Sequence, residues 1–357
     1  MLTHDVSVDA DRGVVVKRFI GADRGEPARE WRALTLLAEH APGLAPEPLT
    51  AELTASPPVI AMSLLPGEPL GGRPLTQDQE SAVIRAVSQL WQAVPVGRVK
   101  SLPGEDTPHA QAELARAVTA MAARTDDRDD DTVVRKARAA GLDWMSWGAD
   151  LSVLRAGDPT GSGHPALPRV FGQGDANLAN FLWDGELVRI VDFEDSGVSD
   201  RAFELAIFVE HLSAWSDAGL AGQRFIGAFE LTIAERSRLA DWRRLAALYW
   251  LLRLRPGGDA EERNPPGTRR RQAERLLALL EGGQCSWKQC SGNSALATPG
   301  GQAGPPPLPA ETVVTDRSLT LMDLQACEVN GTYSGTVWFG GITASQVAFV
   351  GWHFDAE

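Results

Sequence analysis

The feature that most constrains this chain is a run of acidic and amide residues that follows a long helical region. Asp175 comes directly after a glycine, Asn180 lies five positions later, and Asp192 ends a short apolar segment. The turn sequence Asp184-Gly185 separates Asn180 from that segment and is typical of a tight connection between two strands. We therefore expect a short hairpin that places Asn180 and Asp192 side by side.

These residue types, in this order, are the ones that phosphoryl transfer requires. One carboxylate, here Asp175, can orient and deprotonate an acceptor hydroxyl. The amide oxygen of Asn180 and the carboxylate of Asp192 can together hold Mg²⁺ against nucleotide phosphates. Any one of these residues is more often a turn former or a cap. The ordered set and its spacing support the functional interpretation.

The sequence resembles the aminoglycoside phosphotransferase and choline kinase-like family, which shares the protein kinase-like fold. The catalytic loop of that family reads His-Gly-Asp-x4-Asn, and this chain has Gln173-Gly174-Asp175 followed by Asn180. The metal-binding segment of the family reads Ile/Val-Asp-Phe/Trp, and this chain has Val191-Asp192-Phe193. The stretch from Gly197 to Ala206 then matches Gly-x-x-Asp-x-x-x-Asp/Glu-Leu-Ala.

The resemblance implies a role for each matching residue. Asp175 would be the catalytic base, Asn180 and Asp192 would bind Mg²⁺, and ATP would be the phosphoryl donor. Asp200 would be a structural acid that supports the catalytic loop. Glu194 and Asp195, outside the motif, are expected to be surface charges. The alternative is that they add negative field beside the site for a cationic substrate.

The resemblance extends to the first part of the chain. Lys17, in Val-Val-Lys-Arg, matches the strand lysine that contacts the nucleotide phosphates, and Glu30 matches the helix glutamate that pairs with it. The connection between the lobes often reads Leu-Pro-Gly, as it does after Leu64 here. Backbone groups from Ser63 to Leu65 would then meet the adenine.

The periodicity of the sequence predicts a small sheet followed by a mostly helical region, which is an α+β pattern. The resemblance implies that this pattern is a two-lobed, protein kinase-like fold with a small antiparallel sheet in the N-lobe, truncated at its start, and a mainly helical C-lobe. A Pro/Gly-rich linker and a short strand-rich tail would follow. The expected divisions are residues 1–66 for the nucleotide-binding N-lobe, 67–283 for the C-lobe with the catalytic loop and substrate site, 284–310 for the linker and 311–357 for the tail.

Individual elements follow from alternation and helical spacing. The strands expected in the body are 5–9, 13–19 and 59–65, with a hairpin near 181–193. The helices expected are 27–40, 81–94, 110–123, 132–154, 202–214, 221–235, 239–254 and 268–281.

Two departures from the family leave a second hypothesis open. Gln173 replaces the family's histidine, and no Gly-rich loop that could cover phosphates precedes Lys17. The first hypothesis is an ATP-dependent small-molecule kinase that phosphorylates a hydroxyl of an aminoglycoside, choline, a sugar or a similar compound. The alternative is a catalytically weak or inactive kinase-like binding protein.

Composition restricts the partners and the compartment. The chain carries 34 Lys and Arg against 47 Asp and Glu, for a net charge of −13. This balance argues against a nucleic-acid ligand and mildly favours a cationic acceptor. We expect no membrane span and no signal peptide, because neither type of apolar segment is present. All three cysteines lie after residue 284, and their odd number argues against a fold held by disulfide bonds. A cytoplasmic protein is therefore the simplest expectation. Oligomeric state is not predicted.

Overall fold

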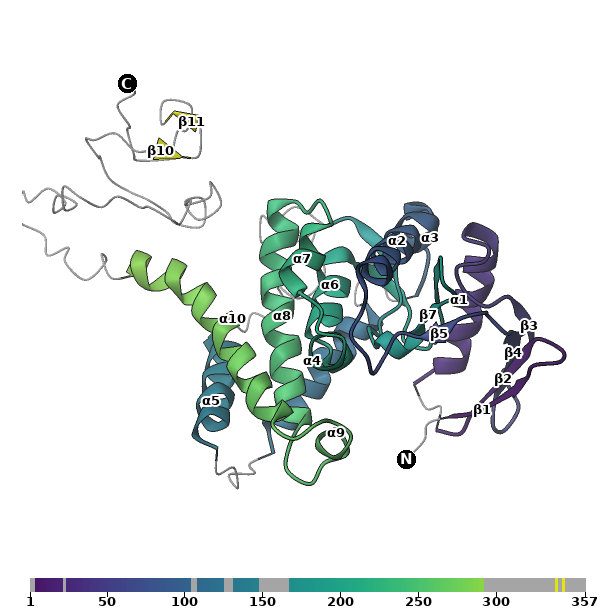
Figure 1. Ribbon diagram of the computed structural model, residues 1–357, viewed down its shortest axis with the longest axis horizontal. Coiled ribbons are helices and arrows are strands. Elements are labelled where there is room, and N and C mark those ends of the chain that lie inside the picture. Colours follow the sequence, from purple (N-terminus) through teal and green to yellow (C-terminus); the bar gives the residue numbers. More distant parts are fainter. Residues whose placement is uncertain are drawn as a thin grey trace, which may run out of the picture. The chain divides into compact units, whose positions relative to one another are not determined.

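The structure, a computed structural model, describes residues 4–21, 24–103, 108–124, 131–147, 167–291, 338–339 and 342–343. The chain separates into two compact units, Met1–Leu277 and Ala278–Glu357. The first unit contains every residue of the predicted catalytic and nucleotide site, and its elements are drawn in Figure 1.

The N-lobe is built on a four-stranded antiparallel sheet in the order β1-β2-β4-β3. In β1 and β2, Val6 lies opposite Lys17, so both side chains lie on the same face of the sheet. The expected strands near residues 5–9, 13–19 and 59–65 are present, and β3 is an additional edge strand. The bounds are β1 His4–Asp9, β2 Val14–Phe19, β3 Pro48–Glu52 and β4 Val59–Ser63.

One long helix, α1 (Glu26–His40), follows β2 and contacts strands β3 and β4. It begins with Pro27 near its first position, where the missing N–H costs nothing. Leu34 and Leu37 are fully buried and anchor the helix. Figure 1 shows α1 lying against the sheet. The helix presents Glu30 toward β2, which carries Lys17.

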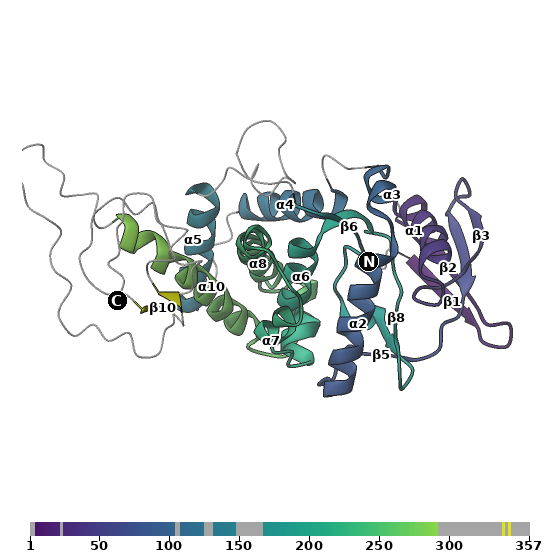
Figure 2. The same cartoon turned by 90° about the horizontal axis from the view of Figure 1, so that it is seen from above.

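The C-lobe is organised around α8 (Ile233–Arg253), which contacts α4, α5 and α6. Figure 2 views α8 nearly along its axis, with α4 beside it. Trp242, in the middle of α8, is almost completely buried and packs edge-on against Phe203 of α6. The remaining helices are α2 Gln77–Ala93, α3 Val96–Lys100, α4 His109–Ala122, α5 Thr132–Trp147, α6 Arg201–Glu210, α7 Gly222–Gly227 and α9 Asp259–Glu262.

Two small sheets carry the polar segment that the sequence singles out. One pairs β6 with β9, and the other has the order β5-β7-β8. Strands β7 and β8 form the expected hairpin, whereas β5, β6 and β9 were not predicted. Their bounds are β5 Glu68–Pro69, β6 Arg169–Gly172, β7 Phe181–Trp183, β8 Val188–Ile190 and β9 Gly197–Asp200.

The expected helix over 221–235 is wrong, because α7 ends at Gly227 and α8 begins at Ile233. The capping box of α8 explains the break. The Thr232 hydroxyl accepts a hydrogen bond from the Glu235 amide, and the Glu235 carboxylate accepts one from the Thr232 amide. The expected helix over 132–154 is present to Trp147, and residues 148–166 lie outside the described part of the chain.

The second unit contains the end of α10 (Thr268–Ser291) and a short pair of strands, β10 Trp338–Phe339 and β11 Ile342–Thr343. Residues 284–291, expected to begin the linker, are helical. They contain no Pro or Gly that would stop a helix. The rest of the expected linker and almost all of the tail lie outside the described residues.

Candidate active site

The catalytic loop begins where β6 ends. Gly174 has a φ of 81°, and a Cβ at this position would lie 2.3 Å from the backbone oxygen of Asp195. A side chain at position 174 would therefore clash with a neighbouring loop and strain the backbone as well. This glycine lets the loop turn sharply, so that Asp175 leaves the strand close to the loop that carries Asp192.

Asp175 is held from two sides. The Asn177 amide donates to its Oδ1 at 3.1 Å, and the Asn180 side-chain amide donates to its Oδ2 at 2.9 Å. Its surface is only partly exposed. Burial, together with the negative charge of Asp192, raises the pKa of Asp175 to about 7, although these two hydrogen bonds oppose the rise. A carboxyl with this pKa is suited to proton transfer near neutral pH.

The hairpin brings Asn180 and Asp192 together as the sequence predicts. The Val191 amide donates to the Asn180 carbonyl at 2.9 Å, which closes the base of the hairpin. Asp192 follows with a φ of 63°, a left-handed conformation that Asp and Asn tolerate better than most residues. Because the Asn180 side-chain nitrogen is directed at Asp175, its oxygen remains for another partner.

Gln173, the departure from the family's histidine, fixes this turn. Its side-chain nitrogen donates to the Val191 carbonyl at 3.2 Å and to the Asp192 carbonyl at 2.9 Å. The residue is almost fully buried. An amide has two N–H groups and can satisfy both carbonyls at once. Gln173 therefore binds the peptide groups before and after Asp192 and holds the backbone on both sides of this residue.

The remaining predicted charges meet in a compact group that we call the lysine cluster, formed by Lys17, Glu30, Asp192 and Glu194. Lys17 Nζ lies 2.7 Å from Glu30 Oε2, 2.6 Å from Asp192 Oδ1 and 3.0 Å from Glu194 Oε2. Lys17 and Glu30 are both buried. The expected Lys17–Glu30 ion pair is therefore present, and it extends directly to Asp192.

Burial and charge act in opposite directions within the lysine cluster. Burial alone would lower the pKa of Lys17, but the carboxylates of Glu30, Asp192 and Glu194 outweigh it and raise that pKa. Burial raises the pKa of Glu30 to about 7, against the attraction of Lys17. Glu194, expected to be a surface charge, is instead a partly buried member of the cluster, because the loop after Asp192 turns back toward β2.

Ser63 and Leu65, the predicted adenine contacts, lie where β4 leads into the C-lobe. The Ser63 amide donates to the Glu47 carbonyl at 2.9 Å, and the Leu64 amide donates to the Gly13 carbonyl at 2.8 Å. Both N–H groups are therefore used within the N-lobe. An adenine contact at this segment remains a prediction. The groups that would make it are the Ser63 carbonyl and Leu65.

A second buried charged group lies deeper in the C-lobe. Asp200 accepts hydrogen bonds on Oδ2 from the side chains of Gln111 and Arg238, at 3.0 and 2.9 Å, and on Oδ1 from the Phe203 amide. We call Gln111, Asp200 and Arg238 the arginine cluster. Asp200 thus caps α6 and ties it to α4 and α8.

The acid that contacts the catalytic loop directly is Glu204, which the sequence reasoning missed in this role. Its Oε2 accepts from the Gln173 amide at 3.2 Å, and its Oε1 accepts from the Ser199 hydroxyl at 2.7 Å. Burial raises the pKa of Glu204 to about 7. The signal was available, since Glu204 is the Asp/Glu position of the motif that ends at Ala206.

Comparison with known proteins identifies the family of this chain. The sequence profile described as the phosphotransferase enzyme family matches residues 5–248, which is more than half of the chain. The chain belongs to this phosphotransferase enzyme family. The predicted resemblance and the kinase-like fold class are both confirmed. Comparison with curated protein sequences gave no significant match.

Among solved structures, the chain is similar to several kinases of small molecules. A choline/ethanolamine kinase family protein from Mesorhizobium loti shares 21% identity over 79% of this chain and 86% of that chain, with a TM-score of 0.44. The choline kinase LicA from Streptococcus pneumoniae shares 12% over 78% and 90%, with a TM-score of 0.46. Aminoglycoside phosphotransferase APH(4)-Ia shares 16% over 78% and 90%, with a TM-score of 0.49.

Among the helices of the described residues, none is long and apolar enough to cross a membrane.

Proposed function

We propose that this member of the phosphotransferase enzyme family transfers the γ-phosphoryl group of ATP to a hydroxyl group of a small molecule. One observation carries the proposal. The lysine cluster joins both lobes, and its Asp192 lies beside the catalytic loop. Val191, which precedes Asp192, donates its amide hydrogen to the carbonyl of Asn180, in the loop that also holds Asp175. A phosphate-binding lysine, two candidate metal ligands and a candidate base thus occupy one continuous site.

The N-lobe sheet offers a surface for the base of the nucleotide. Val6 and Val8 are 52% and 58% exposed, although both are apolar. Val6 lies opposite Lys17 and Val8 opposite Val15, so these side chains share the face that carries the lysine. An exposed apolar surface beside a buried ammonium group suits a flat base linked to anionic phosphates.

The donor set around Asp192 fits Mg²⁺, which prefers oxygen ligands. Asp192 supplies a carboxylate, and Asn180 supplies an amide oxygen because its nitrogen is bound to Asp175. The ion would neutralise the charge that develops on the transferring phosphoryl group. Lys17 would bind phosphate oxygens, and Glu30 would keep its ammonium group in place.

Asp175 is the base that the geometry supports best. The Asn177 amide and the Asn180 side chain fix the direction of its carboxylate. It would accept the proton of the acceptor hydroxyl as the oxygen attacks the γ-phosphorus. Its pKa near 7 keeps a substantial fraction of the carboxyl group unprotonated at neutral pH. The same pKa makes the carboxylate basic enough to accept a proton.

The acceptor would approach from the C-lobe, between α8 and the catalytic loop. Burial raises the pKa of the Tyr249 phenol of α8, and the guanidinium of Arg253 opposes the rise that Asp175 adds. The charges near Tyr249 are therefore mixed and do not select an acceptor. The chain as a whole carries 47 Asp and Glu against 34 Lys and Arg, and this excess mildly favours a hydroxylated cation as the acceptor class.

The test is ATP consumption in the presence of Mg²⁺ and a panel of hydroxylated metabolites and aminocyclitol antibiotics. Wild-type protein should consume ATP with at least one acceptor, and Asp175→Asn should reduce that rate by about 10³-fold. Asp184→Asn is the matched control. Asp184 lies on the hairpin between the two metal ligands and accepts turn hydrogen bonds that Asn can keep. Equal loss of rate in both variants would contradict the assignment of Asp175.

A further inference from the structure

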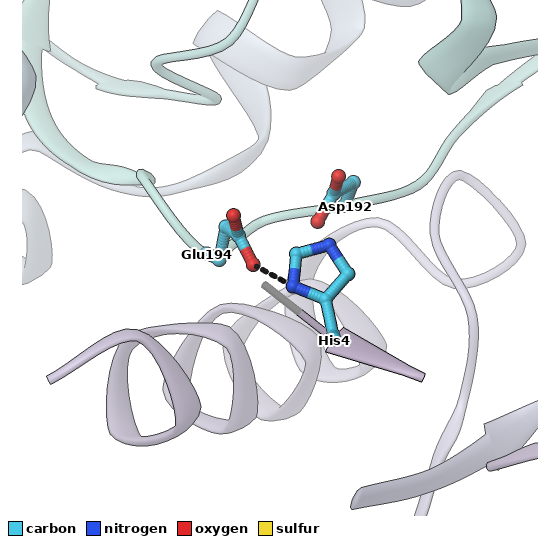
Figure 3. A group of neighbouring side chains, drawn as sticks. All are labelled: His4, Asp192 and Glu194. Carbon is cyan, nitrogen blue, oxygen red and sulfur yellow. Dashed lines mark ion pairs between the residues drawn. The ribbon is translucent and has the colours of Figure 1, made fainter. Parts of the chain in front are cut away.

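His4 lies at the edge of the lysine cluster. It is the first residue of β1, opposite Phe19 of β2, and shares the sheet face that carries Lys17. Its ring packs against Phe19 with centroids 6.0 Å apart, and its Nδ1 lies 3.4 Å from Glu194 Oε2. Figure 3 shows the imidazole between the carboxylates of Glu194 and Asp192.

These three side chains have the spacing of metal ligands. One nitrogen of His4 and one carboxylate oxygen each from Asp192 and Glu194 all lie within 4.8 Å of one another. Ligands about 2.1 Å from a small divalent ion lie roughly 3 to 4 Å apart. Modest side-chain rotation would therefore place all three ligand atoms around one ion.

The charges in the lysine cluster do not balance, and this imbalance favours a bound cation. Lys17 is the only ammonium group in the cluster, whereas Glu30, Asp192 and Glu194 supply three carboxyl groups. Lys17 hydrogen-bonds to Asp192 Oδ1 and to Glu194 Oε2, and the latter oxygen also lies 3.4 Å from His4 Nδ1. Each carboxylate therefore has a second oxygen to which Lys17 does not donate. A divalent cation at those oxygens would offset the excess of negative charge that Lys17 leaves.

We propose that His4, Asp192 and Glu194 form a second divalent-cation site that prefers Mn²⁺ or Co²⁺ to Mg²⁺. The inference rests on the proposed function for the first ion, at Asp192 and Asn180. The two sites would share Asp192, with His4 contributed by the N-lobe sheet and Asn180 by the catalytic loop.

The preference follows from the donor set. Mg²⁺ strongly favours oxygen ligands and keeps much of its water, whereas imidazole nitrogen is a good ligand for the later divalent metals. Glu194 anchors the imidazole from one side and Phe19 packs against it from another. His4 would therefore discriminate between ions as well as bind one.

The test measures Mn²⁺ binding to untagged protein without nucleotide, by titration of the free-Mn²⁺ electron paramagnetic resonance signal. Pulsed measurements on the bound ion would detect coupling to an imidazole nitrogen. Wild-type protein should bind Mn²⁺ and show this coupling. His4→Ala should lose the coupling and bind Mn²⁺ at least about tenfold more weakly. His40→Ala, at the end of α1 and away from the cluster, should behave as wild type.

Two results would overturn the inference: bound Mn²⁺ without imidazole coupling in the wild type, or unchanged Mn²⁺ affinity in His4→Ala. The coupling in wild-type protein requires no variant, so the test does not depend on whether His4→Ala folds. Failure here is distinguishable from failure of the proposed function. A protein that consumes Mg-ATP but shows no imidazole-bound Mn²⁺ keeps the function and lacks the second site.

Discussion

The lysine cluster and the arginine cluster both hold an aspartate against a buried basic side chain, but they differ in their charge balance. In the arginine cluster, both oxygens of Asp200 are engaged by Arg238, Gln111 and the start of α6. In the lysine cluster, one ammonium group faces three carboxyl groups.

The difference separates structural charge from functional charge. A buried pair with matched charge and filled hydrogen bonds holds elements together, and removing one partner is costly. A group with excess negative charge is poorly balanced by itself and is suited to binding a cation. We therefore expect substitutions in the arginine cluster to reduce stability, and substitutions in the lysine cluster to reduce activity.

The largest effect is expected for Asp192→Asn. Turnover of ATP should fall roughly 10³-fold, because a charged ligand is lost where transition-state charge develops. The free energy of unfolding should change by less than about 1 kcal/mol, since Asn also tolerates the left-handed backbone at this position. Steady-state kinetics and urea denaturation of the same preparation measure both quantities. Strong destabilisation would mean that Asp192 is structural.

Asp200→Asn should show the reverse pattern. Asn can still cap α6, but the buried Arg238 would lose its ion pair with Asp200, at a cost of about 3 kcal/mol in the free energy of unfolding. Asp259→Asn is the control, because its pair with Arg263 is exposed and should contribute almost nothing. Equal stability of the two variants in urea would remove the contrast between the clusters.

Gln173 sharpens the comparison, because it joins the catalytic loop to the backbone of the lysine cluster. Gln173→Leu removes both side-chain hydrogen bonds and leaves two carbonyls without this donor, so the free energy of unfolding should fall by about 2 kcal/mol. Gln173→His can keep one of the bonds, so its free energy of unfolding should fall by less than half as much. Denaturant midpoints measure this order, and a Gln173→His protein less stable than Gln173→Leu would contradict it.

The smallest effect concerns pH and Glu204. Its pKa is about 7 in the folded protein, above the ordinary value that the unfolded chain retains. Its contribution to stability is therefore full below about pH 4.5 and is lost as pH rises through 7. As the pH rises from 5 to 8, the free energy of unfolding of Glu204→Gln should increase by at least about 1 kcal/mol relative to that of wild type. A pH-independent difference in urea unfolding would show that Glu204 is already ionised at pH 5.

Much of this architecture could be predicted from the sequence, since motif spacing and periodicity are local. The alternation around Lys17 predicted the first two strands, and the Asp184-Gly185 turn predicted the hairpin that joins Asn180 to Asp192. The motif order predicted the family. Helix 221–235 was wrong, because its apolar spacing suggested continuity while the capping box at Thr232 and Glu235 starts a new helix.

Other features depend on contacts between distant segments, which one sequence does not display. Strands β6 and β9 are short and pair across 25 or more residues, so neither has a strong signal of its own. Glu194 lies beside Asp192 in the sequence, but only the return of its loop to β2 makes it a partner of Lys17. The position of His4 has the same cause, since β1 must pair in register before the imidazole meets Glu194.

The most direct test of the central claim is thermal unfolding with and without millimolar Mg-ATP. A nucleotide that binds the folded state must stabilise it, by about 2.7 kcal/mol at one hundred times its Kd. With Mg-ATP, we expect a higher Tm for wild type and for Asp175→Asn, and little or no increase for Lys17→Met, with Lys100→Met as a surface control. No increase in wild-type Tm would contradict the account and favour a kinase-like binding protein that does not use ATP.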